Sequence, residues 1–188
     1  HIVAEFSGVP PDDHLRALIH RLAPTPEDLM YAKGNSLMEL GEYDGAEDAY
    51  RQFLSVQPDH GGALLGLIRA LLLQGEGREA AILLESFPAS SEYNTAQLLK
   101  SVAKAFTVYR DDAVESDQAM EAVFRNGVRL AQRGNILAAM DGFLDILRKD
   151  RHYRGGEVKE IFVGLLALLG DSHPEVRQYR KDLSSALF

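Results

Sequence analysis

The sequence reads Gly41-Glu42-Tyr43-Asp44-Gly45-Ala46 in its first quarter, and related stretches begin at Gly75 and Gly134. The first two stretches are 34 residues apart, measured between their glycines or between their alanines. The third lies 59 residues after the second, which is one period plus 25 residues. A fixed period of roughly 20–50 residues marks stacked structural repeats. The chain is therefore expected to form an array of three units, with an insertion between the second and the third.

Each unit has the pattern of two helices joined at its glycine. Apolar and small residues recur at helical spacing on both sides, and glycine suits the left-handed backbone that ends a helix. Capping signals predict further helices, beginning near Pro11-Asp12, Thr25-Pro26, Ser90-Ser91 and Ser172-His173-Pro174. We expect an all-α chain of about ten helices, with no strand beyond residues 2–6.

The 34-residue period and its residue types resemble the tetratricopeptide (TPR) repeat. The first copy has Gly34, Ala46 and Tyr50 at the small and aromatic positions of that repeat, although Met30 replaces its usual Trp. The resemblance implies a right-handed α-solenoid over residues 24–188. Its repeats would span about 27–60, 61–91 and 120–153, with an inserted helix at 92–109 and closing helices at 157–169 and 173–187.

Residues that carry catalysis are absent or scattered. The chain has no cysteine, which excludes thiol catalysis, thiolate metal sites and disulfides within it. No two of its six histidines are four residues apart, and no phosphate-binding glycine loop or nucleophile motif occurs. The acidic stretch 111–117 lacks the ligand spacing of an EF-hand. We expect no enzyme activity, no metal and no cofactor.

Charge and hydropathy narrow the class of partner. The net charge is −8, with residues 1–147 at about −10 and residues 148–188 at about +2. An acidic body disfavours nucleic acid, because phosphate binding needs a basic stripe. No apolar run is long enough for a membrane span, and no signal peptide is visible. We therefore expect proteins as partners and a cytoplasmic location, and we interpret the start at His1 as that of a fragment.

Both ends of the chain resemble a more specific family. The tail carries Leu147-Arg148-Lys149-Asp150, an apolar segment ending in Leu169-Gly170, and Tyr179-Arg180-Lys181-Asp182. Residues 1–23 look like the last strand and helix of a thioredoxin fold, followed by a Pro-rich junction. Together these features resemble the bacterial thioredoxin–TPR fusion proteins called chaperedoxins. On this resemblance, residues 1–23 are the remnant of a thioredoxin domain whose main part lies upstream.

The resemblance implies a holdase and co-chaperone that binds unfolding clients and passes them to the chaperonin and the Hsp70 system. It also implies that the C-terminal helix docks to the chaperonin. The residues at the matching positions are Val176, Tyr179, Arg180, Leu183, Leu187 and Phe188. The alternative is a passive scaffold that joins folded partners and has no affinity for unfolded chains. Oligomeric state is not indicated by either interpretation.

A second candidate surface is the concave side of the array, which the first helix of each pair lines in TPR proteins. By alignment it presents Tyr31, Asn35, Met38, Leu65, Arg69, Leu72, Phe124 and Val128. These residues suit an extended apolar segment. Only Asn35 matches the carboxylate clamp of TPR domains that grip chaperone C-termini, so a clamp is not expected. One alternative stays open, in which the inserted helix packs over the groove and fills it.

Overall fold

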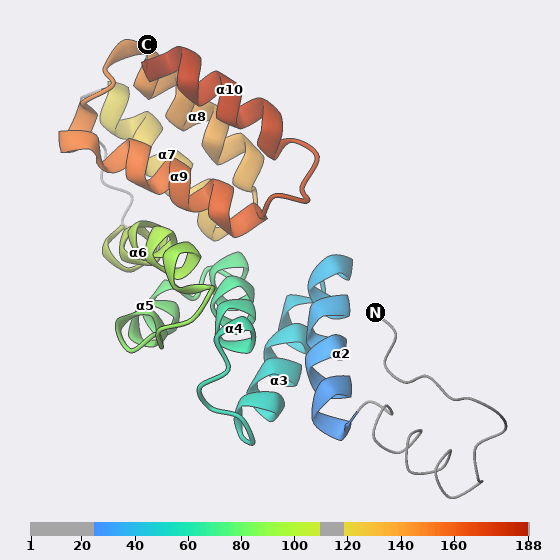
Figure 1. The fold of residues 1–188 in the computed structure, drawn as a ribbon. Helices are drawn as coiled ribbons and strands as arrows, with labels where there is room; N and C mark the ends of the chain where they lie inside the picture. Colours follow the sequence, from blue (N-terminus) through green and yellow to red (C-terminus); the bar gives the residue numbers. More distant parts are fainter. Residues whose placement is uncertain (1–24, 110–118, 188) are drawn as a thin grey trace, which may run out of the picture.

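The computed structural model describes residues 25–109 and 119–187, and all regular structure in them is helical (Figure 1). The predicted all-helical array is confirmed. The expected strand at 2–6, the thioredoxin-like start and the acidic stretch 111–117 lie outside the described residues. The helices are α2 (Pro26–Leu40), α3 (Tyr43–Leu54), α4 (Gly61–Leu73), α5 (Gly77–Glu85), α6 (Tyr93–Val108), α7 (Ala119–Gln132), α8 (Ile136–Lys149), α9 (Glu157–Leu169) and α10 (Val176–Leu187), with a short 3-10 turn, η1 (Tyr153–Gly156), before α9.

Three antiparallel pairs form the repeats: α2 with α3, α4 with α5, and α7 with α8. The first helix of each pair is followed by a glycine with left-handed backbone, at φ +77° for Gly41, +83° for Gly75 and +79° for Gly134. Glycine adopts this conformation without steric cost. A Cβ on Gly75 would also lie 2.5 Å from the carbonyl oxygen of Gln132. The turns of the second and third repeats therefore touch, despite the insertion between them.

The side chain of Tyr50 packs between the helices of the first two repeats. It is 2% exposed on α3, and its ring lies where side chains of Gly34 on α2 and Gly66 on α4 would otherwise project. A Cβ would come within 2.7 Å of the ring at Gly34 and within 2.4 Å at Gly66. Two missing side chains thus make room for one large aromatic ring, which lets three helices approach closely.

The inserted helix α6 packs against α5 on one side and α9 on the other (Figure 1). Both contacts depend on glycine. A Cβ on Gly77 of α5 would lie 2.4 Å from Phe106 Cβ, and one on Gly164 of α9 would lie 2.6 Å from Val102 Cγ2. The chain then returns through α9, and α10 covers α8 and α9. The last two helices thus fold back onto the insertion and the third repeat.

Two glycines inside helices should respond oppositely to alanine. Gly164→Ala should lower the free energy of unfolding by about 1–3 kcal/mol, because its Cβ would also lie 2.7 Å from the backbone oxygen of Leu98. Gly142→Ala in α8 should raise it by about 0.5–1 kcal/mol, because the nearest atom, Val123 Cγ1, is 3.7 Å away and alanine favours the helix. Urea denaturation of both variants checks this. Stabilisation by Gly164→Ala would show that α6 and α9 cross less closely than these distances indicate, and destabilisation by Gly142→Ala would show that α8 has no room for a methyl group beside Val123.

A polar cluster joins the end of α6 to α7, η1 and α9. Its centre is Arg154, which adopts a left-handed backbone at φ +55°. The guanidinium donates to Glu121 at 2.8 Å and to Glu157 at 2.7 Å, and it also bonds the Tyr109 hydroxyl. Its carbon lies 4.5 Å above the ring of Phe124. One cation thus links four segments through charge-assisted hydrogen bonds.

Glu121 gives this cluster a dependence on pH. Burial alone would raise the pKa of this carboxyl, but hydrogen bonds from Arg125, Tyr153 and Arg154 outweigh burial and lower it. A carboxyl with a lowered pKa stabilises the fold at neutral pH. That stability is lost as the pH falls from the ordinary carboxyl pKa through the lowered one.

Glu121→Gln should therefore lower the free energy of unfolding at pH 7 by roughly 1–2 kcal/mol and flatten its fall in acid. Denaturation midpoints at several pH values between neutrality and strong acid measure both effects. Glu85→Gln removes the same charge from an exposed position and is the matched control. Equal acid sensitivity in the wild type and Glu121→Gln would show that this carboxylate does not stabilise the junction.

Candidate protein-binding groove

An open groove of about 810 Å³ lies between α2, α4 and the end of α9. Five of the eight residues predicted for the concave face line it: Tyr31, Asn35, Met38, Leu65 and Arg69. Helix α6 packs on α5 and α9, and of the predicted inserted helix at 92–109 only Glu92, the residue before α6, lines this groove. The groove is therefore open, and the inserted helix does not fill it as the alternative interpretation required.

Three predicted concave residues are not available to a partner. Leu72 and Phe124 are 0% exposed, and Val128 is 1% exposed. The reason is that α4 contacts both α6 and α7, and α7 is covered by α8, so this part of the expected concave face is core. The ring of Phe124 packs against the ring of Tyr109, the residue just after α6, with 5.1 Å between the ring centroids. The prediction for these three residues was wrong because it assumed a regular stack.

The groove also has a wall that the repeat pattern did not indicate. This wall consists of the last turn of α9 and the loop after it, through Leu168, Leu169, Ser172 and His173. These residues lie about a hundred positions from those of α4 in the sequence. Alignment of repeats gives no information on where a closing helix returns, so no signal in the sequence placed them here.

Aromatic and polar groups together shape the floor. The hydroxyl of Tyr50 donates to Asn35 Oδ1 at 2.8 Å, and burial raises the pKa of Tyr50 to about 12. The ring of Tyr31 packs at 5.3 Å from Phe53 and edge-on at 5.0 Å from His60. These aromatic contacts fix the side chains before any ligand arrives. A groove held in this way loses little conformational entropy on binding.

Arg69 is the cation of the groove. Its guanidinium Nη2 donates to the carbonyl oxygen of Ala167 at 2.5 Å, which ties α4 to the end of α9. Burial lowers the pKa of Arg69, while Tyr50 and Asp171 act in the opposite direction. An arginine stays charged at neutral pH despite such a decrease. The groove therefore has one cation next to its apolar walls, together with the carboxylates of Glu39 and Glu92.

The second predicted surface, helix α10, divides into buried and exposed residues. Val176 and Leu183 belong to the core, which corrects their assignment to a docking surface. They are buried because α10 packs on α8 and α9. Tyr179 is half-buried, and its hydroxyl lies 2.8 Å from Asp141 Oδ1.

The remaining residues of that surface are more accessible. Arg180 is exposed and pairs with Asp171. Leu187 is half-buried, and Phe188 lies outside the described residues. Of the six docking residues expected from the resemblance, Arg180 alone is exposed among those the structure describes, with 56% of its side chain accessible.

Two family models, both described as tetratricopeptide repeat, match the sequence over residues 31–95 and 100–188. The chain contains a TPR region. No curated protein matches it significantly. The second match extends through α9 and α10, so the closing helices belong to the TPR region as well. TPR folds are typically non-catalytic modules for protein–protein interaction, and residues of both matched segments line the open groove, with α2 and α4 in the first segment and the end of α9 in the second.

The groove of this TPR region differs from a carboxylate clamp. Asn35, its one clamp-like residue, already accepts the hydrogen bond from Tyr50. Among residues 25–109 and 119–187, no three His, Cys, Asp or Glu side chains gather in a way that could hold a metal ion. Within the same ranges, no helix combines the length and the apolar character needed to cross a membrane.

Proposed function

We propose that this TPR region binds an extended, partly apolar segment of another protein in the groove between α2 and α4. The observation that carries the proposal is the open volume of about 810 Å³, which has both aromatic and apolar walls and the half-buried cation Arg69. Extended segments pair such walls with their side chains and polar groups with their backbone. The aromatic floor is fixed by contacts within the protein, which favours binding without rearrangement.

We further propose that the region serves a cytoplasmic, thioredoxin-related holdase that receives unfolding clients and passes them to the chaperonin and the Hsp70 system. The support is the resemblance of the tail, from Leu147-Arg148-Lys149-Asp150 to Tyr179-Arg180-Lys181-Asp182, to chaperedoxins. A groove without a carboxylate clamp also suits varied unfolded segments better than one fixed acidic terminus. On this proposal the exposed face of α10, with Arg180 at its centre, contacts the chaperonin.

The test is whether the complete protein suppresses the aggregation of a heat-denatured test protein. Light scattering should fall as the protein approaches equimolar amounts, and the protein should co-elute with chaperonin. Arg180→Ala should weaken that co-elution and leave holdase activity unchanged, since it changes no groove residue. A stable complex with one folded partner, combined with undiminished aggregation, would instead identify a passive scaffold.

A further inference from the structure

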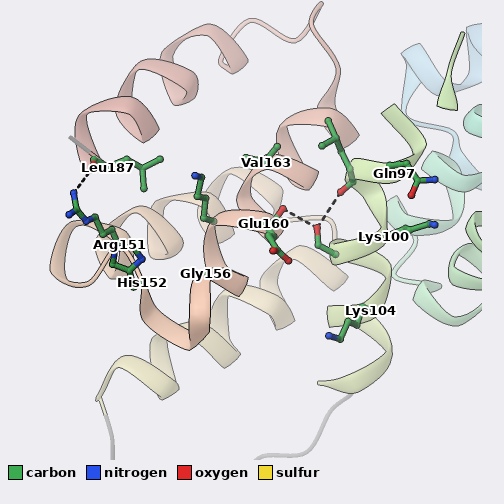
Figure 2. Close-up of a pocket in the computed structure, with 12 residues that line it drawn as sticks. Gln97, Lys100, Lys104, Arg151, His152, Gly156, Glu160, Val163 and Leu187 are labelled. Carbon is green, nitrogen blue, oxygen red and sulfur yellow. Dashed lines mark hydrogen bonds between the residues drawn. The ribbon is translucent and has the colours of Figure 1, made fainter. Parts of the chain in front are cut away.

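A second hollow, also of about 810 Å³, lies between α6 and α9 (Figure 2). The residues around it come from α6, the turn before α9, α9 itself and the end of α10, and none of them lines the groove described above. It is therefore a separate feature of the surface. We call it the α6–α9 pocket, and it depends on the inserted helix that distinguishes this chain from a regular array.

The α6–α9 pocket is basic in a chain of net charge −8. Lys100 and Lys104 project from α6, while Arg151 lies across the hollow before α9 (Figure 2). Lys159 of α9 adds a fourth cation, and Glu160 is the only acidic residue in the lining. Among the described residues, none of the three lysines forms an ion pair. Their charges are available to an anionic ligand.

The same pocket has apolar side chains between its cations. Leu98 of α6 is 44% exposed, and Val163 of α9 and Leu187 of α10 are half-buried residues of the same lining. An exposed leucine inside a hollow gains by contact with an apolar partner side chain. The lining is thus mixed, with apolar side chains and a net positive charge.

Fixed contacts hold the two walls together. Ser101 Oγ of α6 donates to the backbone oxygen of Glu160 on α9 at 2.9 Å, as Figure 2 shows. Arg151 Nη1 donates to the backbone oxygen of Leu187 at 3.1 Å, which ties the turn before α9 to the end of α10. The crossing at Gly164 keeps α6 and α9 in direct contact. The pocket is consequently built into the fold before a ligand binds.

We propose that the α6–α9 pocket binds an acidic amphipathic segment of a partner protein, with its apolar side chains against Leu98 and Val163 and its carboxylates near Lys100, Lys104 and Lys159. Charge complementarity supports this occupant, because the pocket is positive while the chain is negative overall. A flat anionic membrane or a nucleic acid fits less well. Neither has apolar side chains that could enter the hollow and contact Leu98 and Val163.

The experiment measures fluorescence anisotropy of a labelled synthetic peptide with the full chain. The peptide is a twelve-residue amphipathic helix with leucines on one face and glutamates on the other, and its scrambled form has the same composition. We expect saturable binding of the amphipathic peptide that weakens as salt is added, since screening acts over about 8 Å at physiological ionic strength. The scrambled peptide should bind at least about tenfold more weakly.

Charge reversal locates the site. Lys100→Glu combined with Lys104→Glu should weaken binding by at least about tenfold, and Leu98→Ser should weaken it as well. Arg129→Glu combined with Arg133→Glu is the matched control, because both arginines are exposed at the same spacing, at the end of α7 and just beyond it, outside the pocket. The control should leave the affinity within about twofold of the wild type. Circular dichroism verifies that all variants are folded.

Several results would overturn the proposal. It is wrong if the acidic peptide does not bind, if its scrambled form binds equally well, or if the two charge reversals weaken the affinity for the peptide equally. Binding to phosphatidylglycerol vesicles in preference to the peptide would identify a membrane surface instead. Self-association that the α6 charge reversal abolishes would identify a second copy of the chain. Because Met38 and Tyr31 do not line this pocket, groove variants leave the assay unaffected, and failure here is separate from failure of the proposed groove function.

Discussion

Tyr50→Ala is expected to lower the free energy of unfolding by about 3–5 kcal/mol, the largest effect of any single substitution considered. The side chain is 2% exposed, and it fills the space that Gly34 and Gly66 leave empty. Neither glycine has a side chain that could move into the resulting cavity, so the cavity remains. The loss should also open the floor of the groove.

Tyr50→Phe separates the ring from its hydroxyl. This variant keeps the packing against both glycines and loses only the bond to Asn35, so it should cost about 0.5–1.5 kcal/mol. Urea denaturation followed by circular dichroism measures both variants. Similar losses for alanine and phenylalanine would mean that the hydrogen bond, and not the ring, holds the first two repeats together.

Met38→Asp is expected to weaken the binding of an unfolded protein segment by at least about tenfold. Met38 lies in the wall of the groove on α2. A carboxylate there must be desolvated when an apolar segment enters, which is costly without a partner. The measurement is the affinity for a fluorescently labelled, reduced and alkylated test protein that cannot fold.

Leu29→Asp is the control for Met38→Asp. It introduces the same charge on the same helix at a position that is 58% exposed and does not line the groove. Its affinity should remain near that of the wild type. Equal weakening by the two variants would indicate general repulsion by negative charge. Thermal unfolding shows whether Met38→Asp remains folded, because the wild-type side chain also packs against the core.

The repeat pattern predicted the parts of the fold that rest on local rules. Left-handed glycines at Gly41, Gly75 and Gly134 end the first helices because backbone geometry demands it. Close packing of Tyr50 on Gly34 likewise follows from the residue sizes in one repeat. Such features need only neighbouring residues, so one sequence is sufficient to find them.

The repeat pattern could not predict how segments far apart in the sequence pack together. Phe124 was predicted to lie on an open concave face, but α6 and α8 bury it, because the insertion changes what faces the third repeat. The α9 wall of the groove and the burial of Leu183, where α10 packs on α8 and α9, have the same origin. Single-sequence alignment places residues within repeats, whereas contacts between an insertion and a closing helix depend on the whole chain.

An NMR titration tests directly whether the groove between α2 and α4 binds a partner segment. The isotope-labelled chain is mixed with the unlabelled unfolded test protein, and the backbone amide shifts are followed residue by residue. We expect saturable shifts at Tyr31, Leu65, Arg69 and Ser172, and their loss in Met38→Asp. Shifts confined to residues outside the groove, or identical shifts in Met38→Asp, would contradict it.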